Sequence, residues 1–157
     1  MMETLTALHD SALSTWIRES ESVWAFPTVL TVHTLGMMLL VGCAWVVDLR
    51  LLGVARTVPL GPLRPLFRIM WAAFWINFVT GVLLFIADPE RKSTSLLFWS
   101  KMFLIIINLP LIIRIEKAIF RDSPDPVTVS SAARRLAAVS AMLWAGTIFT
   151  GRLLGYM

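Results

Sequence analysis

The 157-residue chain is poor in the residue types on which many soluble enzymes and disulfide-rich domains depend. It contains one cysteine, two histidines and one tyrosine, and only 15% of its residues are charged. Cys43 has no partner for an intrachain disulfide. The sequence also lacks a glycine-rich phosphate loop, a zinc-ligand spacing and a nucleophile elbow. These absences exclude a disulfide scaffold and leave no motif for nucleotide, zinc or acyl-transfer chemistry.

Apolar residues, in contrast, are abundant and make up 57% of the chain. They form four runs, at about 24–47, 66–87, 96–115 and 136–156, and each is close to the ~20 residues that a helix needs to cross a bilayer. Prolines in the short connections favour sharp turns between neighbouring runs. We therefore expect one all-α domain over 1–157, an integral membrane bundle of four antiparallel helices surrounded by lipid.

A shorter amphipathic segment precedes the first apolar run. Its apolar residues recur at helical spacing, at Leu5, Leu8, Ala12 and Trp16. Tryptophan favours the headgroup region of a membrane, and both Trp16 and Trp24 fall near the expected boundary. The pattern predicts a short interfacial helix within 1–21.

The distribution of basic residues predicts the orientation of the bundle. Nine of the 14 Lys and Arg residues lie in or next to the connections between runs one and two and between runs three and four: Arg50, Arg56, Arg64, Arg68, Arg114, Lys117, Arg121, Arg134 and Arg135. Such connections face the cytoplasm. We therefore expect a multi-pass protein of a bacterial inner membrane with both termini periplasmic. The net charge of +4 is divided between these connections, so it does not indicate a nucleic-acid partner.

Each run carries one polar residue at a similar depth. Counted from the outer ends at about 1.5 Å per residue, the four residues lie roughly 13 to 18 Å inside the membrane. They are His33, Asn77, Asn108 and Thr147. Lys101 and Arg152 lie nearer the outer surface, at roughly 4 to 8 Å. The sequence thus predicts a polar layer with two cations above it.

Two interpretations of this layer remain open. In the first, His33 is a metal ligand that binds haem b, Gly36 leaves room for the flat macrocycle, and Lys101 and Arg152 contact the propionates. In the second, the polar residues only hydrogen-bond between helices, each bond contributing about 0.6 to 2 kcal/mol, or they line a path for an ion or small solute.

The haem interpretation requires a partner for His33 on the other side of the iron. His9 lies in the interfacial segment, and Met37 and Met38 share a helix with His33. The remaining arrangements are a five-coordinate iron, a methionine of another helix such as Met142, or His33 of a second subunit. A copper site fits less well, because it needs several soft ligands at one depth.

Charged residues near the inner ends of the runs have a simpler expected role. Asp48 and Arg50 end the first run, and Arg114 lies near the end of the third. Charges at such positions extend to water or pair locally. We therefore expect them to anchor the helices.

Four segments of the sequence resemble a family of small bacterial inner-membrane proteins of uncharacterised function. They are "HTLGMMLLVG" with "VVDLRLLG", "NFVTGVLLF", "KMFLIIIN" and "WAGTIFTGRLLGYM". That family is loosely similar to the membrane domain of copper-resistance protein D and to four-helix b-type cytochromes. The resemblance implies a four-helix bundle with a histidine-bearing core. The polar positions that match the pattern are His33, Asp48, Arg50, Lys101 and Arg152.

These observations together favour a small haem-binding or redox-associated inner-membrane subunit with a site around His33. We expect it to form a homo-oligomer or to join a larger membrane complex. The alternative is a non-enzymatic accessory or transport protein in which His33 is a packing residue.

Overall fold

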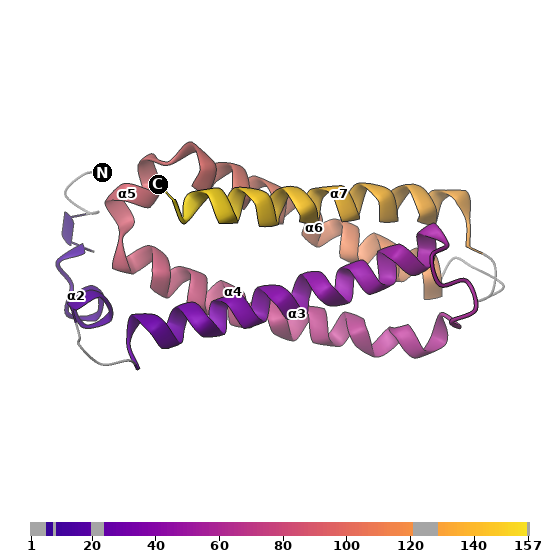
Figure 1. The fold of residues 1–157 in the computed structure, drawn as a ribbon, viewed down its shortest axis with the longest axis horizontal. Coiled ribbons are helices and arrows are strands. Elements are labelled where there is room, and N and C mark those ends of the chain that lie inside the picture. The colour runs from indigo at the N-terminus through magenta and orange to yellow at the C-terminus, as the bar shows by residue number, and fades with distance from the viewer. Residues whose placement is uncertain (1–5, 8, 20–23, 121–128, 157) are drawn as a thin grey trace.

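Four long helices dominate the computed structural model, which describes residues 6–7, 9–19, 24–120 and 129–156 (Figure 1). They are α3 (Phe26–Leu52), α4 (Arg64–Ala87), α6 (Leu96–Phe120) and α7 (Ser131–Leu154). Each is long and apolar enough to cross a membrane. The expected all-helical membrane bundle is therefore confirmed, and no strand occurs in the described part of the chain.

Two short helices lie at one end of the bundle. Helix α2 (Ala12–Glu19) confirms the short N-terminal helix, although part of the expected 1–21 segment lies outside the described residues. Its buried side chains are Ser14 and Ile17, whereas Trp16 is half exposed. Helix α5 (Pro89–Thr94) connects α4 to α6 at the same end.

The bounds of the helices follow from local chemistry. Helix α3 ends at Gly53, whose left-handed φ of 100° lets its N–H reach the carbonyls of Leu49 and Arg50. The 3-10 helix η1 (Gly61–Leu63) then leads into α4, whose first turn contains Pro65. Helix α7 starts after Ser130, whose side chain accepts a hydrogen bond from the N–H of Ala133.

The long helices form two pairs, α3 with α4 and α6 with α7, and α3 also packs against α7. Figure 1 shows that the pairs lie close together where the 53–60 segment leads from α3 towards η1, which we call the loop end. They diverge towards the opposite end, where α2, α5 and the C-terminus lie, which we call the terminal end. Helix α2 and the C-terminal end of α7 therefore lie on the same side of the bundle.

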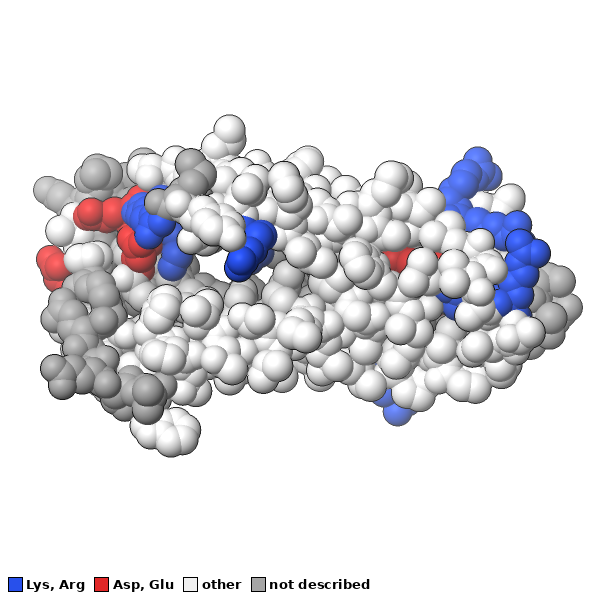
Figure 2. Space-filling model, viewed as in Figure 1, with Lys and Arg blue, Asp and Glu red and all other residues white. Residues whose placement is uncertain are grey.

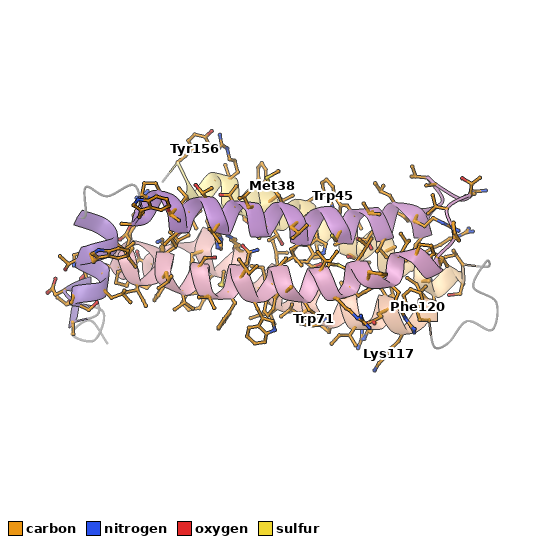
Figure 3. All side chains as sticks on the ribbon, turned by 90° about the horizontal axis from the view of Figure 1, so that it is seen from below. Met38, Trp45, Trp71, Lys117, Phe120 and Tyr156 are labelled. Carbon is orange, nitrogen blue, oxygen red and sulfur yellow. The ribbon has the colours of Figure 1, made fainter. Side chains whose placement is uncertain are left out.

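The apolar core fills only the half of the bundle nearer the loop end. It contains Leu40, Val41, Cys43, Ala44, Val47, Leu51, Leu60, Leu63, Phe67, Met70, Ala73, Ile112, Ile115, Ile119, Ala137 and Trp144. In the terminal half of the long helices, the buried positions are mostly polar or small: Gly36, Asn77, Thr80, Ala87 and Thr147. Met38 and Trp45 point away from the neighbouring helices, as lipid-facing side chains do (Figure 3). The bundle is thus tightly packed at one end and weakly packed at the other.

Candidate functional site

His33 projects from α3 towards α4 in the weakly packed half. Its Nδ1 lies 2.9 Å from Oγ1 of Thr80. The Thr80 hydroxyl itself lies 2.7 Å from the Ile76 carbonyl, to which it donates its only proton. The Thr80 oxygen must therefore accept from His33, and we assign the imidazole proton to Nδ1. In the neutral ring this tautomer leaves a lone pair on Nε2.

Thr80 contacts His33, but it was not among the residues predicted from their depth in the membrane. It lies one helical turn from Asn77 and on the same face of α4, so both approach α3. Gly81 lies beside the ring as well, since a Cβ there would be 3.4 Å from Cε1 of His33. The sequence signal for Thr80 was its spacing of three residues from Asn77, which places both on one face of a helix.

The haem interpretation places a flat macrocycle beside Gly36. In the structure the neighbour of Gly36 is the side chain of Asn77. A Cβ on Gly36 would lie 2.6 Å from Nδ2 of Asn77. Asn77 donates through that nitrogen to the Ala73 carbonyl at 3.1 Å, and the Asn77 Oδ1 is buried without a partner among the described residues. In this structure Gly36 therefore permits close contact between α3 and the Asn77 side chain.

Asn108 and Thr147 are fully buried but belong to the other helix pair. Asn108 donates to the Leu104 carbonyl at 3.0 Å, and Thr147 donates to the Leu143 carbonyl at 2.8 Å. Both bonds stay within a single helix. The expected polar layer therefore consists of two groups, with direct contacts around His33 coming from α4.

Lys101 reaches the site from α6, and Lys92 reaches it from α5. The Lys101 Nζ and Cε lie 3.6 Å from the position that a Cβ of Gly151 would take, so the side chain runs along the surface of α7. Lys92 donates from Nζ to the Leu84 carbonyl. Both ammonium groups are close enough to His33 to act on it electrostatically. Sequence analysis missed Lys92, because it lies outside the four apolar runs.

Burial has the largest effect on the pKa of Lys92. It lowers the pKa of the ammonium group, since the charged form loses contact with water. The nearby carboxylate of Asp88 opposes this shift, while the positive charges of Arg91 and Lys101 add to it.

Arg152 is not brought together with Lys101 in the way that the sequence led us to expect. Its guanidinium lies 5.0 Å from the ring centre of Tyr156, and both side chains are exposed. Figure 3 shows Tyr156 pointing away from the bundle. Arg152 therefore faces the outer surface.

A hollow opens in the terminal half of the bundle, the half in which His33 lies. Figure 2 shows the surface hollowed between α7 and α4 at the terminal end, with Lys and Arg side chains at the edge. Burial agrees with this view, because none of the residues 96–107 of α6 is fully buried. We call this space the terminal hollow.

Of the side chains considered as second ligands, the sequence analysis set aside His9 and Met37 and kept Met142. His9 interacts with Asp10 at 3.1 Å, Met37 follows His33 on the same helix, and Met142 is 67% exposed on α7. Over the part of the chain that the structure describes, no three His, Cys, Asp or Glu residues are grouped as a metal site.

Asp48 and Arg50 differ from the expected exposed anchors. Asp48 is 1% exposed and hydrogen-bonds with the Ser140 side chain of α7, although one carboxylate oxygen has no partner among the described residues. Arg50 is 6% exposed and donates to the Val58 carbonyl, so it closes the segment after α3. Both side chains link parts of the protein and do not extend to water.

Comparisons with protein families, with curated proteins and with solved structures give no match for this chain, so its function is inferred from the residues around His33.

Proposed function

We propose that this protein is a small haem-binding or redox-associated membrane subunit and that Nε2 of His33 is the iron ligand. The observation that carries the proposal is the imidazole of His33, which Thr80 orients in the weakly packed terminal half of the bundle. A histidine that binds a metal commonly donates its other ring N–H to a fixed acceptor, which sets the tautomer and the orientation of the ring. Thr80 supplies such an acceptor here.

His33 is the residue that would hold the haem iron, and Met142, the methionine considered as a second ligand, is exposed on α7. A five-coordinate site, or one completed by His33 of a second subunit, is consistent with this arrangement. When bound, haem would supply one-electron transfer or gas binding at the iron. The chain itself would orient the imidazole through Thr80 and restrict access from the loop end through its packed core.

The location proposed for this subunit is a bacterial inner membrane, with both termini in the periplasm. Support comes from the basic residues near the loop end, including Arg56, Arg64 and Arg68, and from the positive-inside rule. The terminal hollow would then open towards the periplasmic side.

A second candidate function is a structural or solute-conducting role for the polar residues. It is favoured by the hydrogen bonds that Asn77, Asn108 and Thr147 each donate to a carbonyl of their own helix, none of which needs a ligand. In that case His33 would only join α3 to α4 through Thr80.

A visible spectrum distinguishes the two functions. We expect protein purified in mild detergent after haem-replete expression to show a Soret band that shifts on reduction, and His33→Ala to abolish it. His9→Ala is the matched control and should keep the band, because His9 precedes the bundle helices and its Nδ1 interacts with Asp10. A five-coordinate site should also bind carbon monoxide when reduced. A colourless wild-type protein, or a band that survives in His33→Ala, would contradict the haem proposal.

A further inference from the structure

Lys101 carries a positive charge in the terminal half of the bundle without a described counter-ion. Its side chain is half buried and lies along Gly151, and no carboxylate of the described residues is within ion-pair distance. Gly151 allows this position, since a larger residue would occupy the space that the Lys101 side chain takes. A buried ammonium group is costly unless an anion or several hydrogen bonds compensate it.

Lys92 adds a second positive charge to the same region. Lys101 acts on Lys92 as a like charge, and Lys92 donates a hydrogen bond to the Leu84 carbonyl. A neutral carbonyl satisfies one donor of the ammonium group but leaves its charge uncompensated. Two ammonium groups near each other repel, so this arrangement costs free energy when no anion is bound between them.

The carboxylates of α5 and its flanks are engaged elsewhere. Asp88 lies 3.9 Å from Arg91, and Glu90 accepts a hydrogen bond from Thr6 at 3.4 Å. Asp88 attracts Lys92 only at longer range. Among the described residues, no carboxylate therefore forms an ion pair with Lys92 or Lys101.

His33 and Lys92 both contact the terminal part of α4, because His33 lies beside Gly81 and Lys92 donates to the Leu84 carbonyl less than one turn further along. Lys101 and Lys92 both act on His33 electrostatically. A ligand that coordinates to Nε2 of His33 and extends towards the membrane surface would bring its far edge to Lys92 and Lys101. Because ammonium groups bind carboxylates through charge-assisted hydrogen bonds, the expected groups at that edge are carboxylates.

We infer that Lys92 and Lys101 together bind the carboxylate groups of the ligand held by His33, so that the ligand is an acidic porphyrin and not a neutral one. This inference rests on the proposed function. The sequence analysis placed Lys101 and Arg152 at the propionates. The pair inferred from the structure is Lys92 of α5 and Lys101 of α6. It also gives α5 a role, because this short helix positions Lys92.

The test compares binding of hemin and of hemin dimethyl ester, in which both propionates are neutral. Protein depleted of haem is reconstituted in zwitterionic lipid nanodiscs, and each compound is titrated while the Soret band is followed. A hydrogen bond to a charged group contributes about 1.5 to 3 kcal/mol, so wild-type protein should prefer hemin by at least about tenfold. Lys92→Gln/Lys101→Gln should lose this preference and still bind the ester.

Arg91→Gln is the matched control, because Arg91 is the exposed neighbour of Lys92 on the same helix. It should keep the full preference for hemin. If Arg152→Gln loses the preference for hemin while the double lysine variant keeps it, Arg152 and not the two lysines binds the propionates. That result would overturn the inference.

The remaining outcomes separate the inference from the proposed function. Equal binding of both compounds by wild-type protein would reject the carboxylate contact while leaving His33 as iron ligand. Binding of neither compound would reject both. A preference that disappears when anionic phosphatidylglycerol replaces the zwitterionic lipid would show that the lysines hold a lipid phosphate, which also overturns the inference.

Discussion

At the scale of single residues, two glycines of α3 have opposite surroundings. Gly36 is in contact with Asn77, whereas Gly42 has no atom within 4 Å of the position of a Cβ. Glycine at the first position is required by the approach of another side chain. At the second it is not required by any contact within the described protein.

We therefore predict different effects of alanine at these two positions. Gly36→Ala should lower the free energy of unfolding by about 1 to 3 kcal/mol, the usual cost of overpacking, because the new methyl group meets Nδ2 of Asn77. Gly42→Ala should be neutral or stabilising by up to about 1 kcal/mol, because alanine favours helix. Thermal unfolding in detergent, followed by circular dichroism, measures both. Equal losses would show that Asn77 does not determine the effect.

At the scale of secondary-structure elements, α3 divides into two parts with different packing. From Leu40 to Leu51 it contributes most of its buried apolar residues to the core. From Phe26 to Leu39 its one fully buried residue is Gly36, and His33 is only partly buried. Local opening is easier where few apolar contacts must be broken.

Hydrogen exchange should reveal this division. We expect backbone amides of residues 29–38 in α3 to exchange faster than those of residues 41–51, because the first group borders the terminal hollow and the second lies in the packed half. Mass spectrometry of peptides from the detergent-solubilised protein provides the measurement. Uniform protection along α3 would indicate that the hollow is closed in solution.

At the scale of the whole molecule, the charges and the fold agree on a direction across the membrane. The 53–60 segment and its flanking arginines lie at the loop end, opposite α5 and the C-terminus. Basic residues next to membrane helices favour the cytoplasmic side. The terminal end should therefore face outward.

Labelling of single cysteines tests this orientation. In a Cys43→Ser background, we expect Glu90→Cys to react in intact cells with a maleimide that cannot cross the inner membrane. Arg56→Cys should react only after the cells are opened, because it lies at the other end of the bundle. The reverse pattern would place the terminal hollow on the cytoplasmic side and overturn the proposed location.

The amino-acid sequence was sufficient to predict the class of protein and the number of its long helices. Apolar runs of ~20 residues are long enough to cross a bilayer, and a helix satisfies its backbone hydrogen bonds within itself. The spans could therefore be predicted without knowing how the helices pack. It also identified His33 as the unusual residue, because an ionisable side chain inside a span is rare.

Only the tertiary structure decided which residues meet His33. Position along a helix gives depth, but contact also depends on the rotation of each helix and on how far the helices separate. Asn108 and Thr147 have the right depth but lie in the other helix pair, while Thr80 provides the hydrogen bond. Rotation likewise turns Arg152 towards Tyr156, and the short helix α5 brings in Lys92, which no apolar run contains.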